Sequence, residues 1–370
     1  MLIGYDELRG RPNYATARNC YAPVPGVRHT RISRLPVDAL ARHGGLGDAA
    51  FLPARPARTD AVHLWNKISL GRQPWGVSIE SILPRLLRAQ PGSRLMRLLR
   101  SRLLDDRCRF IAPISDWSHD LFLETLTPAE LAVIQPKTHR VYPYQRVDMD
   151  DAPVEAPGAG EPLHIGFVGG EFFRKGGEAL LAVADRWGDD LDLRFHVVTA
   201  CTRRDYATPW ISDEHITRTR SRLEQHPRIS WYPSLPNADV LGLMRRMHVG
   251  VLPTMAETFG FSLLEFMSVG RPVIGTNPQA GAEILGPDRS WTLELELRPD
   301  RLWVGRSGTD FAYGLGVLSL TEQLGAVLES IRADPGSLVD KGGAARRHVA
   351  ARYLGERTAQ MTQLYAEAFG

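Results

Sequence analysis

Two glutamates separated by seven residues, Glu257 and Glu265, are the first candidates for chemistry in this sequence. An ionised carboxylate only accepts hydrogen bonds and can hold two hydroxyl groups at once, so each glutamate suits a ligand with neighbouring hydroxyls. The residues that follow the first glutamate are Thr258, Phe259, Gly260 and Phe261. A helix beginning near Gly260 would present its N–H groups and the positive end of its dipole to a phosphate, and the glycine would let that ligand approach the backbone.

A glycine-rich segment is the second candidate, because it combines an unobstructed backbone with two cations. It contains Gly169, Gly170, Arg174 and Lys175. The two basic side chains supply donors suited to a diphosphate. The segment is not a Walker loop, since no Gly-Lys-Ser/Thr follows at the required gap, and it is not the G-x-G-x-x-G pattern of a nicotinamide site. It is therefore a candidate phosphate cradle of another class.

Short apolar runs precede both candidates and predict the elements that hold them. Residues 163–169 and 249–253 resemble buried parallel strands, and helical patterns follow each of them, at 178–187 and from 261 until Gly270. Further strands are expected at 193–199, 229–232 and 272–276, with a helix at 237–247 between two of them. This alternation predicts a doubly wound parallel sheet, whose ligands bind at the carboxyl ends of the strands.

The first half of the chain has a similar, weaker pattern. Strands are expected at 1–5, 59–66, 74–80, 109–115 and 141–145, with a loop at 10–19. Two of these strands place a polar residue where such a sheet binds ligands, and these residues, Glu80 and His63, are candidates to face a ligand. A single histidine at the end of a strand can equally be a hydrogen-bonded structural group. We expect Ser115 to cap the helix that follows it.

Leucines and arginines alternate at helical spacing within residues 84–104, so one face is apolar and the rest basic. One interpretation is a helix that lies on an anionic membrane and brings the protein to a lipid-linked molecule. The other is an ordinary domain helix with its leucines packed inward and its arginines solvated or paired with Asp105 and Asp106. A strong amphipathic pattern does not separate the two, and both stay open.

The overall composition excludes several classes. With 43% hydrophobic and 24% charged residues, the chain is typical of a soluble globular protein of two domains, and its N-terminus lacks the features of a signal peptide, so we expect it in the cytoplasm. A net charge of +3 gives no reason to expect nucleic acid as a partner. Three widely spaced cysteines suggest buried free thiols. The D-x-D triplets at 148–150 and 190–192 are too short to indicate a metal site, and no metal is expected.

These motifs together resemble family 4 of the retaining glycosyltransferases with the B fold. The segment from Glu257 to Glu265 resembles the E-x7-E motif of that family, and residues 270–277 and 282–284 resemble the family's next segments. The glycine-rich segment is similar to the family's G-x-x-x-x-x-K-G loop, in which the lysine, here Lys175, contacts the donor phosphates. Two positions depart from the family: Gly170 stands where an arginine is frequent, and Glu80 where many members have histidine.

The resemblance implies the GT-B architecture, in which two Rossmann-like domains face a central cleft. We expect an acceptor domain at 1–150, a linker at 151–162, a donor domain at 163–350, and a final helix at 351–370 that crosses back to the first domain. The resemblance also implies retaining, metal-independent transfer of a hexose from a nucleoside-diphosphate sugar, of UDP or GDP type, to a glycan, lipid-linked or small-molecule acceptor, as in bacterial polysaccharide biosynthesis.

The resemblance implies a role for each candidate residue. Lys175 would neutralise the leaving diphosphate together with Arg174, which would compensate for Gly170. Glu265 would bind the ribose, and Glu257 would orient the sugar. Three alternatives remain open: a nucleotide-sugar epimerase, a glycoside phosphorylase of the same fold, and a sugar-nucleotide-binding protein that has lost catalysis.

Overall fold

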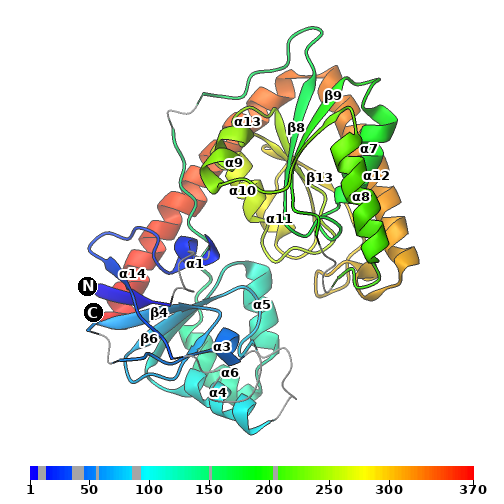
Figure 1. The fold of residues 1–370 in the computed structure, drawn as a ribbon. Coiled ribbons are helices and arrows are strands. Elements are labelled where there is room, and N and C mark those ends of the chain that lie inside the picture. Colours follow the sequence, from blue (N-terminus) through cyan, green and yellow to red (C-terminus); the bar gives the residue numbers. More distant parts are fainter. Residues whose placement is uncertain (7–13, 36–45, 56–57, 86–92, 150–151, 203–206) are drawn as a thin grey trace. The chain divides into compact units, whose positions relative to one another are not determined.

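The computed structural model describes residues 1–6, 14–35, 46–55, 58–85, 93–149, 152–202 and 207–370 of the chain. These residues form two compact units, which are drawn in Figure 1. The first unit comprises Met1–Tyr144 and Ala351–Gly370, and the second comprises Gln145–Ala350. The polypeptide therefore leaves the first unit once and returns to it for the last twenty residues.

The first unit is built on a five-stranded parallel sheet with the order β2-β1-β4-β6-β7. Its strands are β1 (Leu2–Tyr5), β2 (Arg28–Arg31), β4 (Ala61–Trp65), β6 (Trp75–Ile79) and β7 (Cys108–Pro113). The short strands β3 (Ala50–Phe51) and β5 (Ile68–Ser69) pair separately. The strand order reverses between β1 and β4, and such a switch point is where doubly wound sheets bind ligands.

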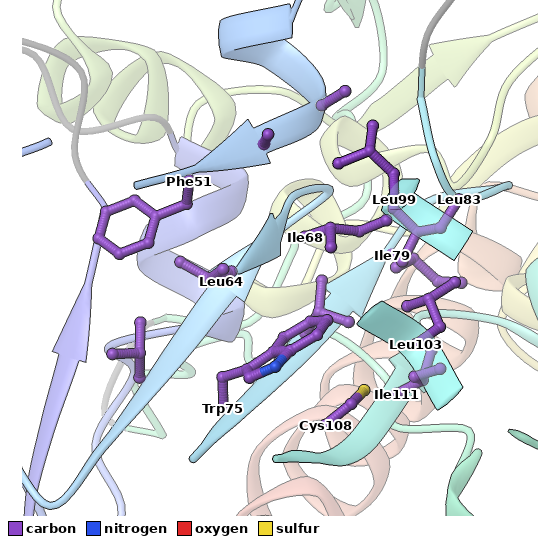
Figure 2. Close-up of a cluster of buried hydrophobic side chains, with 14 of the residues drawn as sticks. Phe51, Leu64, Ile68, Trp75, Ile79, Leu83, Leu99, Leu103, Cys108 and Ile111 are labelled. Carbon is purple, nitrogen blue, oxygen red and sulfur yellow. The ribbon is translucent and has the colours of Figure 1, made fainter. Parts of the chain in front are cut away.

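Helices cover both faces of this sheet. One face carries α3 (Leu46–Ala49), α4 (Arg94–Leu104), α5 (Asp116–Glu124) and α6 (Pro128–Ile134), which ends in a 3-10 turn at Gln135–Lys137. Their apolar side chains and one side of the strands form the cluster in Figure 2, with Trp75 fully buried among Leu64, Ile79, Leu99 and Leu103. On the opposite face, α14 (Arg357–Phe369) packs Met361, Leu364 and Tyr365 against Ile3, Phe110 and Ala112. The remaining helix of this unit is α1 (Tyr14–Asn19).

Helix α4 is packed into this unit, with Leu99 and Leu103 fully buried. Arg100 lies 2.8 Å from Glu130, and Arg102 lies 2.7 Å from Asp105. These contacts are those of an ordinary domain helix, one of the two interpretations of residues 84–104. The part of that segment at 86–92 lies outside the described residues.

Local sequence signals account for most element boundaries, with one exception. The Ser115 hydroxyl accepts a hydrogen bond of 3.0 Å from the Ser118 N–H and caps α5, which confirms the prediction. The predicted strand at 141–145 is wrong, because this segment has no strand structure. The Val141 N–H donates to the Pro113 carbonyl at the end of β7, but Pro143 has no N–H with which to continue the ladder. The loop expected at 10–19 contains α1, and its residues 10–13 lie outside the described residues.

The second unit contains a six-stranded parallel sheet with the order β10-β9-β8-β11-β12-β13. The strands are β8 (Leu163–Val168), β9 (Leu193–Val198), β10 (Ile229–Tyr232), β11 (Val249–Leu252), β12 (Val273–Thr276) and β13 (Ser290–Leu293). Numbered in chain order, this is the 3-2-1-4-5-6 arrangement of the Rossmann fold. Its switch point lies between β8 and β11, the two strands that precede the candidate motifs.

Helices lie on both sides of the second sheet (Figure 1). One side carries α7 (Gly177–Trp187), α8 (Asp213–Gln225) and α12 (Asp310–Ala333), and the other carries α9 (Asn237–Met244), α10 (Phe261–Ser268) and α13 (Gly336–Val349). The unit also contains α11 (Gly281–Ile284) and a 3-10 turn at Val304–Ser307, and a π-helix at Ala350–Glu356 joins α13 to α14. The doubly wound fold expected from the sequence is thus present in both units.

Two further properties concern the described residues as a whole. Helix α12 is long and apolar enough to cross a membrane by length and composition, yet core helices pass the same test, and Leu320, Leu324 and Leu328 of α12 are fully buried. Cys20, Cys108 and Cys201 are buried free thiols, as expected from their spacing.

Candidate active site

Two loops meet at the switch point of the second sheet. One follows β8 and runs from Gly169 to Gly176, and the other follows β11 and runs from Pro253 to Gly260. Both leave the carboxyl ends of adjacent parallel strands, so the topology places them side by side. They contain the two motifs that the sequence singles out.

Gly176 lets the two loops touch. Its backbone has φ +77°, a left-handed conformation that side chains disfavour, and a Cβ atom built there would lie 1.9 Å from the Pro253 carbonyl oxygen. The Met255 N–H also donates a 2.9 Å hydrogen bond to the Arg174 carbonyl. The main chain of the loop after β8 is thus in direct contact with the main chain of the loop after β11.

Lys175 and Glu257 form an ion pair across this junction. The Lys175 Nζ lies 3.0 Å from the Glu257 Oε2, and both side chains are 14% exposed. The Lys175 stem lies over Gly169, where a Cβ atom would come within 2.5 Å of the lysine Cδ. Burial raises the pKa of Glu257. The nearby charges of Lys175 and Arg174 and the hydrogen bond from the Phe259 N–H lower it by more, so the pKa lies below its ordinary value. Glu257 is therefore an ionised, acceptor-only group at neutral pH.

Arg174 stands beside this pair but faces protein atoms. Its guanidinium is 9% exposed, and its Nη1 donates to the Ala256 carbonyl and lies 3.6 Å from Glu257. Its Nη2 donates to Glu171 at 3.1 Å. The structure thus brings both predicted cations to Glu257, with Lys175 closer to the carboxylate.

Helix α10 begins four residues after Glu257. Gly260 is its N-cap, with φ +90°, and no side chain caps this end of the helix. The Phe259 N–H donates to Glu257. Ser262, at the second position of α10, has a buried hydroxyl that lacks a hydrogen-bond partner among the described residues. Reasoning from sequence missed Ser262, although a hydroxyl in the first turn of a helix beside a candidate phosphate site is a recognisable signal.

The other predicted residues of the second unit surround these loops. Gly170 is exposed, and a Cβ atom there would meet nothing within 4 Å, so the position where the family often has arginine is open space. Thr258 and Phe261 are partly exposed, and the Phe259 and Phe261 rings lie 5.3 Å apart. Glu265 lies in the second turn of α10 and is 6% exposed.

Glu80 lies at the carboxyl edge of the first unit's sheet, directly after β6. Its carboxylate accepts hydrogen bonds from the Asn66 side chain at 3.1 Å and from Arg85 at 2.8 Å. Asn66 has φ +54°, an uncommon conformation for a residue other than glycine. The next residue, Lys67, pairs with Asp6 after β1 at 2.5 Å. The sequence analysis did not single out these partners, although Asp6 and Asn66 directly follow the ends of β1 and β4.

His63 lies inside the first unit and faces no solvent. Its Nδ1 lies 2.7 Å from the Tyr365 hydroxyl, and its Nε2 lies 2.9 Å from the Ser78 hydroxyl. Burial holds its pKa well below the usual range, so the ring is neutral at pH 7. Because both ring nitrogens have protein partners, His63 has the environment of a hydrogen-bonded structural histidine. Among the residues that the structure describes, no group of three or more His, Cys, Asp or Glu side chains could hold a metal ion.

Comparison with known proteins agrees with this geometry. Residues 162–296 match the family model described as glycosyl transferases group 1. The match covers both loops, α10 and all six strands of the second sheet. No curated protein matches the chain by sequence.

Solved structures resemble the whole chain. Sucrose-phosphate synthase of Thermosynechococcus elongatus is 15% identical with a TM-score of 0.59, and the match covers 100% of this chain and 99% of that one. HepE of Anabaena, in complex with UDP and glucose, is 13% identical with a TM-score of 0.59 and 99% of both chains covered. A glycosyltransferase of Rickettsia africae is 11% identical with a TM-score of 0.57, covering 92% of this chain and 85% of that one.

The two parallel sheets and these matches over the full chain define the GT-B fold, as the sequence predicts. Within the second unit, residues 162–296 match the sequence pattern of group 1 glycosyltransferases.

The contact of Gly176 with Pro253 makes a prediction about stability. Gly176→Ala should lower the free energy of unfolding by at least about 2 kcal/mol, because the new Cβ atom collides with a backbone carbonyl and the left-handed conformation is strained. Urea unfolding followed by tryptophan fluorescence measures this change. Gly170→Ala is the matched control and should stay within about 0.5 kcal/mol of the parent, because that position is open. Equal stability of the two variants would contradict the described packing.

Proposed function

We propose that the protein transfers a hexose, with retention of configuration and without a metal, from a nucleoside-diphosphate sugar of UDP or GDP type. The acceptor would be a glycan, a lipid-linked molecule or a small molecule, as in bacterial polysaccharide biosynthesis. The observation that carries this proposal is the ion pair of Lys175 and Glu257 at the switch point of the second sheet. A sheet of this topology binds nucleotides at that position, and HepE, which has the same fold, binds UDP and glucose.

Different residues of this site would bind different parts of the donor. The Lys175 ammonium carries three donors and a full charge, so it would stabilise the negative charge that develops on the leaving diphosphate. The uncapped start of α10 and the Ser262 hydroxyl would add donors to the same phosphates. Glu257, ionised and acceptor-only, would hold hydroxyls of the sugar, and Glu265 would hold the ribose. No metal is needed in this scheme, because residues of the chain supply the positive charge.

The acceptor would bind at the carboxyl edge of the first unit's sheet. Glu80 is our candidate there, since its carboxylate is oriented by Asn66 and Arg85 and the pair Lys67 and Asp6 lies next to Asn66 in the sequence. His63 is a weaker candidate, because both of its nitrogens have protein partners.

The nucleotide itself can be identified by ligand-dependent stability. We expect either UDP or GDP, out of a panel with ADP, CMP and NAD, to raise the thermal midpoint selectively, because a ligand that binds the folded state stabilises it by mass action. At a concentration of 100 times Kd the gain is about 2.7 kcal/mol. A shift with NAD alone, or with none of these compounds, would be evidence against a nucleotide-sugar site.

Removing either charge of the ion pair should abolish transfer. Glu257→Gln and Lys175→Gln should each lower kcat about 100-fold or more, because groups that stabilise the transition state have effects of that size. Hydrolysis or transfer of the sugar from the donor that the nucleotide panel selects provides the assay. Glu214→Gln, an exposed change on α8, is the control and should keep full activity. Full activity of either site variant would refute the assignment, and circular dichroism would show that the variants are folded.

The reaction products separate the alternative functions. Turnover of a donor without any acceptor to give an isomeric sugar would indicate an epimerase, and a requirement for inorganic phosphate would indicate a glycoside phosphorylase. Binding of the nucleotide without turnover of any donor would favour a non-catalytic sugar-nucleotide-binding protein. The open space at Gly170 is the feature that most favours this last alternative.

We also propose that the protein acts in the cytoplasm, either free or in contact with the inner face of the membrane through residues 84–104. The exposed side of α4 carries Arg94, Arg97, Leu98 and Leu104, so both alternatives have a structural basis. Its buried leucines and paired arginines favour the free protein. We therefore expect no co-sedimentation with liposomes of anionic lipid at about 0.15 M salt. Binding that is lost in Arg94→Glu/Arg97→Glu would instead establish the membrane contact.

A further inference from the structure

Arg174 differs from Lys175 in the hydrogen-bond partners of its side chain. Its guanidinium donates to the Ala256 carbonyl through Nη1 and to the Glu171 carboxylate through Nη2. The same Nη1 lies 3.6 Å from Glu257. A guanidinium presents its donors in a rigid planar fork, so one that is held by two partners on different segments has little freedom to turn toward a ligand.

The backbone of Arg174 contacts the same segment. The Met255 N–H donates to the Arg174 carbonyl at 2.9 Å, and the Thr254 hydroxyl lies 3.4 Å from that carbonyl. The Thr254 hydroxyl also donates to the Ala256 carbonyl at 3.0 Å. Main chain and side chain of one residue therefore hold the three residues that immediately precede Glu257.

Lys175 makes a different set of contacts. Its stem lies against Gly169, and its ammonium approaches Glu257 at 3.0 Å. An ammonium has three donors that rotate freely about the last carbon bond, so a diphosphate can bind it while the lysine stem stays in place. Of the two cations, Lys175 is the one whose geometry suits a ligand.

We propose that Arg174 is a positioning residue for Glu257 and that Lys175, rather than Arg174, contacts the donor diphosphate. Arg174 fixes the segment 254–256, and this segment sets the place from which the Glu257 carboxylate reaches the sugar. Glu171 in turn orients Arg174. This inference rests on the function proposed above, and it replaces the shared phosphate role that the sequence suggests for the two cations.

Nucleotide binding and turnover, measured separately, test this division. Arg174→Gln should leave the Kd of UDP or GDP, whichever stabilises the parent protein, within about twofold, because no phosphate contact is lost. It should lower kcat for sugar release from UDP-glucose or GDP-mannose about 10- to 100-fold, because a small displacement of a catalytic group has effects of this size. Lys175→Gln should raise the Kd at least about tenfold. Isothermal titration calorimetry gives the first quantity and nucleotide release gives the second.

Two further variants keep the test valid if Arg174→Gln does not fold. Glu171→Gln should lower kcat by a smaller factor at unchanged Kd, since the guanidinium loses its charged partner at position 171 but keeps the Ala256 carbonyl. Arg174→Lys should recover only part of the parent kcat, because it keeps the charge beside Glu257 but not the fork that reaches Ala256. A purely structural role would instead lower the thermal midpoint and leave kcat per folded molecule unchanged, which would contradict the proposal.

The possible failures are distinguishable. If Arg174→Gln raises the Kd as much as Lys175→Gln does, Arg174 is a phosphate ligand and the inference is overturned while the proposed function stands. If the Arg174 variants keep the parent kcat and Kd, the inference is again overturned by itself. If the parent protein binds neither UDP nor GDP, the proposed function fails and the inference falls with it.

Discussion

The site depends on the cost of placing opposite charges in a partly buried position. Lys175 and Glu257 are each largely shielded from water, and a charge in such a position is costly unless an opposite charge lies beside it. Their meeting requires that two loops from different strands come into backbone contact, and Gly176 permits this contact at Pro253. The parallel Rossmann order of the sheet then decides where the pair lies, because it makes β8 and β11 neighbours at the switch point, where ligands bind beyond the carboxyl ends of the strands. Electrostatics, backbone sterics and topology thus determine one location together.

Much of this arrangement could be predicted from the sequence, because it depends on local patterns. The strand at 229–232 was predicted with its observed bounds, and the pairing of a glycine-rich loop with the E-x7-E segment follows from two similar strand-loop-helix patterns. The contacts that could not be predicted join distant parts of the chain. His63 lies in the middle of β4 and has Tyr365 as a partner, 302 positions away, and no local pattern indicates that the last helix will cover this histidine. The wrong strand at 141–145 has a local cause, since Pro143 has no N–H with which to continue the hydrogen-bond ladder.

The two units use similar sheets with different surroundings. In the second unit the switch-point loops carry glycines and cations, which suit a phosphate. In the first unit the corresponding edge carries reciprocal hydrogen bonds between Asn66 and Glu80 and the buried pair of Lys67 and Asp6. A network of this kind holds acceptors and donors at fixed positions. The same architecture thus carries chemically different groups at the edges of its two sheets.

The return of the chain to the first unit has a consequence for how the protein is made. Met361, Leu364 and Tyr365 of α14 complete the apolar cluster on one face of the first sheet, beside Ile3 and Phe110. During synthesis a domain ordinarily begins to fold as soon as its own residues have left the ribosome. Here the part of this face that α14 covers stays uncovered until residues 351–370 emerge, after the entire second unit. The nascent first unit therefore lacks these contacts for the whole time that the second unit is being translated.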